Sequence, residues 1–211
     1  MIEQYTTGVL LAYGVFMIGI FTPGPNILAI VGTSMSTGRT EGKSLAFGIA
    51  TGSLAWGSLT LFGLTGLITL YASVMTALKI AGAFYLLWLA FKAFRSALST
   101  KDLKLKTIVV KGGSWSYYRR GVIIQMTNAK AALVWIAIMS LAMDGQAPIW
   151  VGGMVVLGTA IISFAGHWAY AVAFSTAPVV AAYGRTRRWV EGALGAYFCF
   201  ASYKLITYKS S

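Results

Sequence analysis

The sequence contains a single cysteine, Cys199, among its 211 residues. One cysteine excludes an intrachain disulfide and any dithiol redox motif, so an electron carrier that works through paired thiols is ruled out. Charged residues are also scarce, at 10% of the chain, against about 25% in a soluble domain. Hydrophobic residues make up 57%, and they fall in several runs long enough to cross a bilayer, which takes roughly 20 residues. The sequence therefore predicts an all-α polytopic membrane protein.

Other absences narrow the function. No Lys or Arg precedes Arg39, so the basic start of a signal peptide is missing and we expect the first apolar run to stay in the mature chain. No Asp or Glu lies near the centre of a predicted span, which argues against a carboxylate site for a metal ion or sodium, and modestly against a cationic substrate. There is no P-loop and no nucleophile–base arrangement. We therefore expect no ATP-driven transport, no enzyme activity, no metal and no cofactor.

The apolar runs predict six transmembrane helices. Their approximate ranges are 6–36, 43–70, 74–97, 117–143, 148–174 and 187–208. The one long polar loop is 99–114, and no soluble domain is predicted. We therefore treat residues 1–211 as a single transmembrane transporter domain, with one half in 1–98, a basic cytoplasmic loop in 99–114 and a second half in 115–211.

Basic residues predict the orientation of these spans. Of the 17 Lys and Arg residues, 13 fall in or beside the loops that would share one face of the membrane. Because basic loops stay in the cytoplasm, we expect both termini outside, in the periplasm if the membrane is a bacterial inner membrane. The net charge of +12 is then explained by topology and by contact with anionic lipid, and no nucleic-acid partner is implied.

The first span is interrupted at its middle by the run Thr22-Pro23-Gly24-Pro25-Asn26. Each proline removes a backbone donor and disfavours helix at the preceding residue. A break at this depth leaves backbone groups that lipid cannot satisfy, and it is tolerated where it is buried in protein or lines a cavity. We interpret the break as a binding site, with a packing kink as the alternative.

The fourth span carries Thr127-Asn128-Ala129-Lys130 at a corresponding depth. In addition, the run 82–85 (Gly-Ala-Phe-Tyr) of the third span resembles 195–198 (Gly-Ala-Tyr-Phe) of the sixth. Three spans per half would place the two halves in opposite orientations, so these similarities predict a 3+3 inverted repeat. Inverted repeats with interrupted helices near the midplane are typical of secondary transporters.

Two half-helices that start near Asn26 and Lys130 would bring their N-termini together. Free N–H groups at those ends, with the ammonium of Lys130, suit a carboxylate. Asn26 and Asn128 would cap the half-helices or bind substrate directly. The carbonyls freed around 21–23 and 125–127 could receive an ammonium group, so the pair of breaks predicts an amino-acid site. A lysine at this depth costs roughly 2.5–3.5 kcal/mol, although it could also snorkel or serve a structural role.

Four further residues are weaker candidates. His167 could carry a proton, but a lone histidine among aromatic and small residues is more often a packing residue. Glu191 lies beside Arg187 near the cytoplasmic end of the sixth span, and a surface ion pair is its default interpretation, with proton coupling as the alternative. Gly48 and Gly52 have the spacing of small residues that let two helices approach closely.

Taken in order, these motifs resemble the LysE/RhtB family of amino-acid exporters. The resemblance rests on residues 22–26, the paired glycines 38/42 and 48/52, residues 82–86, and Asn128-x-Lys130-Ala131. It implies a bacterial inner-membrane exporter that exchanges amino acids for protons and forms homo-oligomers. Family members usually have proline where this chain has Ala129. Since alanine favours helix, we expect the fourth span to be less broken than the first.

The sequence leads to one functional hypothesis and two alternatives. We expect alternating access around a site formed by Pro23, Gly24, Pro25, Asn26, Asn128 and Lys130, with a neutral amino acid such as leucine, threonine or homoserine as substrate. The alternatives are a channel-like or non-amino-acid efflux protein of related fold, and a structural membrane subunit that transports nothing.

Overall fold

The computed structural model describes residues 3–22, 24–70, 72–99, 112–143 and 147–207, and most of these residues are in helices. Eight helices are present in them: α1 (Glu3–Phe21), α2 (Pro25–Ser36), α3 (Arg39–Leu70), α4 (Ala72–Ala97), α5 (Ser114–Met126), α6 (Ala129–Ala142), α7 (Ile149–Ala173) and α8 (Ala177–Thr207). The prediction of an all-α protein is confirmed. Most of the loop predicted at 99–114, including 100–111, lies outside the described residues.

Two of the helix pairs form bent units rather than separate elements. Helices α1 and α2 meet at 45°, and α5 and α6 meet at 62°. By length and apolar composition, Arg39–Gly63 of α3 and the whole of α7 could each cross a membrane, and the number rises to four if each bent pair is one span. Together with the high hydrophobic content and low charged content of the chain, these apolar helices identify a membrane protein.

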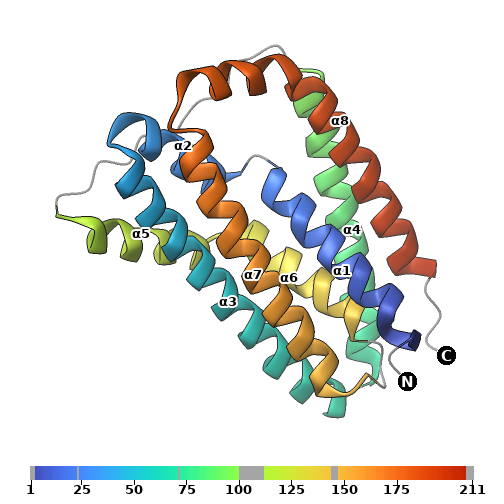
Figure 1. Cartoon of the computed structure of the whole chain (residues 1–211). Helices are drawn as coiled ribbons and strands as arrows, with labels where there is room; N and C mark the ends of the chain where they lie inside the picture. The colour runs from blue at the N-terminus through green and yellow to red at the C-terminus, as the bar shows by residue number, and fades with distance from the viewer. Residues whose placement is uncertain (1–2, 23, 71, 100–111, 144–146, 208–211) are drawn as a thin grey trace.

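The helices are arranged as two tightly packed groups that meet at the bent pairs. In one group α3 packs along α5 and α7, and in the other α4 packs along α8, while α6 contacts both α1 and α4. Figure 1 shows α3 beside α7 on one side of the bundle and α4 beside α8 on the other. The breaks of the two bent pairs therefore lie in the interior, where both groups reach them.

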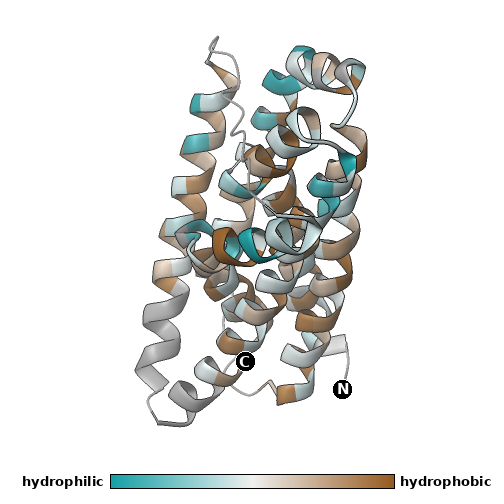
Figure 2. Ribbon diagram, turned by 90° about the vertical axis from the view of Figure 1, so that its left-hand side faces the viewer, coloured by the Kyte–Doolittle hydropathy of each residue, from teal (hydrophilic) through white to brown (hydrophobic). Residues whose placement is uncertain are grey.

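Hydrophilic residues are distributed unevenly along the bundle. Figure 2 shows hydrophilic residues gathered toward the end of the bundle where α4 finishes and α8 begins. Figure 1 shows the start of α1 and the end of α8 at the opposite end. Helix α1 thus begins, and α8 ends, on the same side of the bundle.

Glycines set the close approach of α3 to α5. A Cβ added at Gly48 would overlap the backbone carbonyl of Tyr118, and one added at Gly121 would overlap that of Leu45. At Gly52 an added Cβ would lie 2.8 Å from Cβ of Gln125, which is closer than real Cβ contacts. Gly48 and Gly52 therefore lie at the closest approach of α3 to α5.

Candidate functional site

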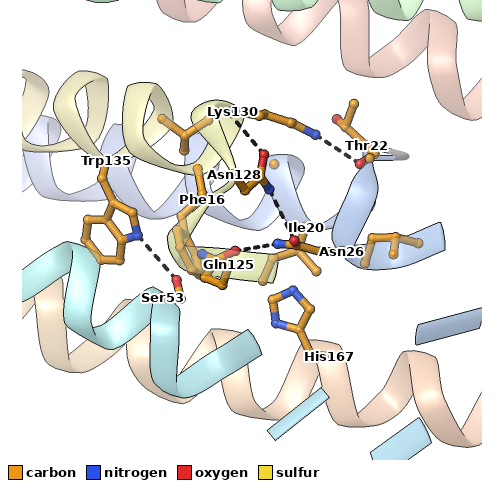
Figure 3. Close-up of a pocket in the computed structure, with 15 residues that line it drawn as sticks. Phe16, Ile20, Thr22, Asn26, Ser53, Gln125, Asn128, Lys130, Trp135 and His167 are labelled. Atoms are coloured by element: carbon orange, nitrogen blue, oxygen red, sulfur yellow. Dashed lines mark hydrogen bonds between the residues drawn. The ribbon is translucent and has the colours of Figure 1, made fainter. Parts of the chain in front are cut away.

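The interior cavity of the bundle lies at the two breaks. Its volume is about 50 Å³ and it is lined from α1, α2, α3, α5, α6 and α7 by Phe16, Gly19, Ile20, Thr22, Gly24, Asn26, Ile27, Ser53, Gln125, Asn128, Lys130, Ala131, Val134, Trp135 and His167. Figure 3 shows the polar members converging from opposite breaks. A volume of this size holds only a few waters, so the site is closed to anything as large as an amino acid in this conformation.

The first break is the segment between α1 and α2. The chain leaves α1 at Phe21, and the Thr22 hydroxyl donates to the Ile18 carbonyl at 3.0 Å. Helix α2 restarts with Pro25 as its first residue, where a missing N–H costs nothing. Leu28 N–H bonds back to Gly24 O, so the N–H groups of Asn26 and Ile27 are the ones that helix geometry leaves without an intrahelical acceptor. Pro23 lies outside the described residues.

The second break is sharper than expected, and the prediction that Ala129 would weaken it is wrong. Asn128 has an extended backbone (φ −87°, ψ 98°), and its side chain accepts a hydrogen bond from Lys130 N at 3.1 Å. It is therefore the N-cap of α6. A proline is not required to end α5 here, because a capping asparagine supplies the acceptor that lets a new helix start. Ala129 then occupies the first helical position.

The two breaks are joined by side-chain hydrogen bonds. Nδ2 of Asn128 donates to Oδ1 of Asn26 at 3.1 Å, and Nδ2 of Asn26 donates to Oε1 of Gln125. The two asparagines that sequence reasoning selected thus contact each other directly. Gln125 was missed, although an amide in the otherwise apolar run Gly121–Met126 was a signal that could have been followed.

Lys130 crosses from the second break to the first. Its Nζ donates a hydrogen bond to the Thr22 carbonyl at 3.1 Å. The side chain passes close to Gly24: a Cβ added at that position would lie 3.4 Å from Nζ, in ordinary van der Waals contact. The side chain is half-buried, and two of the three ammonium N–H bonds remain for another acceptor. From α4, the Tyr85 hydroxyl donates to the Lys130 carbonyl at 3.1 Å, which fixes the first turn of α6.

The freed carbonyls are not all available to a ligand, contrary to expectation. The Thr22 carbonyl accepts from Lys130, and the Gln125 carbonyl accepts from the indole N–H of Trp56 at 3.1 Å. Internal donors therefore already bond to two of the carbonyls that we assigned to a substrate ammonium, which leaves each of them one lone pair.

His167 and Glu191 are both buried, with 4% and 1% of their surface exposed. His167 lines the cavity from α7. Glu191 does not line it; the carboxylate lies between α4 and α8 with Ser96 as a hydrogen-bond partner and within electrostatic reach of Arg187 and Lys130. The surface location that the default interpretation gave Glu191 is wrong, because the carboxylate is inside the bundle.

The sequence was then compared with known proteins. Residues 17–209 match the family described as LysE type translocator. The chain belongs to the LysE type translocator family. It is 32% identical to the uncharacterized membrane protein YahN of Escherichia coli K12, over 94% of this chain and 88% of that protein. The predicted family membership is confirmed.

Further relatives of this LysE family translocator have named activities. It is 26% identical to the threonine efflux protein of Salmonella typhimurium and 24% identical to that of Escherichia coli K12, in each case over 87% of this chain and 90% of the relative. No solved structure matches the chain.

Proposed function

We propose that this protein exports an amino acid from the cytoplasm by alternating access around the cavity at the two breaks, in exchange for protons. In this proposal the chain crosses a bacterial inner membrane six times, as a 3+3 inverted repeat with each bent pair as one span and both termini in the periplasm. His167 and Glu191 are the candidate proton carriers. Family membership and the efflux function named for two relatives support the transport step.

The observation that carries the proposal is the position of Lys130. Its ammonium lies at the meeting point of two half-helix N-termini, where it is half-buried and has N–H bonds to spare. Asn26 and Ile27, whose backbone N–H groups belong to the first turn of α2, line the same cavity. A substrate carboxylate placed between them would meet one full and one partial positive charge, which is the kind of anion site that helix ends provide.

The lining favours a neutral side chain. Around the polar centre lie the apolar side chains of Phe16, Ile20, Ile27, Val134 and Trp135, together with the hydroxyl of Ser53. Among the described residues that line the cavity there is no carboxylate, and Glu191 lies outside it. A cationic side chain would therefore find no counter-charge, whereas threonine, homoserine or leucine could be accommodated when the cavity opens.

The test is counterflow in proteoliposomes loaded with unlabelled amino acids and given a panel of labelled ones, with and without a pH gradient. Saturable exchange of one neutral amino acid, accelerated by the gradient, is the expected result. Exchange of none of them would leave the non-amino-acid efflux protein or the non-transporting subunit. Conductance that does not saturate with substrate would identify a channel.

A further inference from the structure

The tautomer of His167 is fixed by its neighbour on α7. Its Nδ1 lies 2.8 Å from the Ser163 carbonyl oxygen and 3.1 Å from the Ser163 hydroxyl. A carbonyl oxygen can only accept, so Nδ1 must carry the hydrogen. In the neutral ring Nε2 then holds a lone pair and acts as an acceptor.

The acceptor edge of the ring is directed into the cavity. Figure 3 shows the ring of His167 projecting from α7 toward Asn26, opposite the side from which Lys130 enters. No residue within the described ranges makes a hydrogen bond to Nε2. Only 4% of the surface of the side chain is exposed, so a group that bonds to this nitrogen has to arrive through the cavity.

Several other acceptors around the cavity already have a donor within the protein. The Thr22 carbonyl accepts from Lys130, Oδ1 of Asn26 accepts from Asn128, and Oε1 of Gln125 accepts from Asn26. In the same way Oγ of Ser53 accepts from the indole of Trp135 at 3.3 Å. These oxygens each keep a second lone pair, whereas Nε2 of His167 has no donor at all among the described residues, so its lone pair is free for an ammonium that enters the cavity.

We infer that Nε2 of His167 binds the substrate ammonium while Lys130 binds its carboxylate, and that a proton competes for the same lone pair. This assignment rests on the proposed function. The two groups reach the cavity from α7 and α6, so a zwitterion would lie between them. An amine without a carboxylate, or a carboxylate without an amine, would satisfy only one side.

Competition for one lone pair gives exchange without a second site. When Nε2 takes a proton, a new N–H bond forms, the ring becomes a cation with two donors, and an ammonium is repelled. Substrate and proton therefore occupy the site in turn, as antiport requires. The groups that line the cavity together with the ring are the amides of Asn26 from α2 and Gln125 from α5, the hydroxyl of Ser53 from α3, apolar side chains from α1, and Lys130 from α6. Lys130 is the charged group among the described lining residues.

The experiment compares His167→Gln with His167→Leu in proteoliposomes, with labelled threonine as the probe. Glutamine keeps a neutral acceptor that cannot be protonated, whereas leucine removes the acceptor. We expect His167→Gln to show more threonine counterflow than His167→Leu but less than the wild type, to lose its pH dependence and to lose acceleration by a pH gradient. We expect His167→Leu to raise KM for counterflow by about 10- to 100-fold, as loss of one hydrogen bond to a charged group predicts.

A deamino analogue separates the ammonium contact from a structural role. 3-Hydroxybutyrate keeps the carboxylate and hydroxyl of threonine but has no ammonium. Its inhibition of wild-type and His167→Leu counterflow should therefore differ by less than about twofold, although threonine itself binds the variant far more weakly. Equal losses for both compounds would mean that the histidine only supports the fold, and would overturn the inference.

Failure of this inference is distinguishable from failure of the proposed function. If Lys130→Ala abolishes threonine counterflow while both His167 variants behave as wild type with an intact pH response, the exporter stands and the ammonium site is elsewhere. If wild-type protein exchanges no amino acid at all, the proposed function itself is wrong.

Discussion

The ammonium of Lys130, on one broken helix, donates a 3.1 Å hydrogen bond to the carbonyl of Thr22 on the other. A charged group at this depth is costly unless it is paired, and the partner is a carbonyl that the first break leaves free. The bond therefore explains how the protein holds a lysine in its interior before any anion arrives. It also makes Lys130 the point at which substrate binding and the geometry of both breaks are joined.

Lys130→Ala is expected to reduce amino-acid export by at least about 100-fold, because it removes the one full positive charge of the anion site. Membrane insertion should be unchanged, since the substitution makes the span more apolar. The measurement is counterflow at equal protein density. Lys204→Ala is the matched control, because that ammonium lies over the Phe200 ring, 5.9 Å from its centroid, away from the cavity. Normal transport by Lys130→Ala would place the site elsewhere.

Asn128→Ala is expected to destabilise the protein by about 1–2 kcal/mol, since it removes the N-cap of α6 and the bond to Asn26. The measurement is the midpoint of thermal unfolding in detergent. Asn128→Asp keeps the capping oxygen and should recover part of the loss. A variant as stable as the wild type would show that α6 starts without help from this side chain.

Gly48→Ala is expected to lower the unfolding midpoint or prevent folding, because its Cβ would overlap backbone of α5 that cannot move without separating the helices. The control lies on the same helix: a Cβ at Gly63 meets nothing within 4 Å. Gly63→Ala should be neutral or slightly stabilising, since alanine favours helix by about 1 kcal/mol over glycine. Equal behaviour of the two variants would contradict the close packing of α3 and α5.

Glu191→Gln is expected to fold and to keep its response to a pH gradient, because the amide can still bond with Ser96 and the proton is assigned to His167. Glu191→Ala should lose about 1–3 kcal/mol of stability through the unpaired polar groups it leaves behind. Thermal unfolding and gradient-driven export measure the two effects separately. If Glu191→Gln folds but shows no gradient-driven export, the coupled proton is carried by the Glu191 carboxylate and the assignment to His167 is wrong.

Much of the fold could be predicted because apolar runs and prolines are local signals. The first break was located at Pro23–Pro25 from proline chemistry alone, and α2 does begin at Pro25. The close contact through Gly48 followed from spacing. The second break was underestimated, because the prediction gave weight to a missing proline and little to Asn128, whose capping depends on the side chain turning back to Lys130 N.

The parts that could not be predicted depend on contacts between distant helices. Burial of Glu191 requires α4 to cover α8, and nothing in the neighbouring residues shows that. The role of Gln125 depends on a hydrogen bond that its side chain accepts from Asn26, on a helix about a hundred residues earlier in the chain. The hydrogen bonds to the freed carbonyls of Gln125 and Thr22 have the same origin, because their donors, Trp56 and Lys130, come from other elements.

The bond between Asn26 and Asn128 has a consequence for how such a protein can change over generations. A substitution at either asparagine leaves the other amide without its partner in the interior. Each position therefore constrains the choice at the other, although they stand in opposite halves of the chain. In an alignment of related sequences, positions 26 and 128 should vary together, and a chain that has lost one amide should carry a compensating residue at the second.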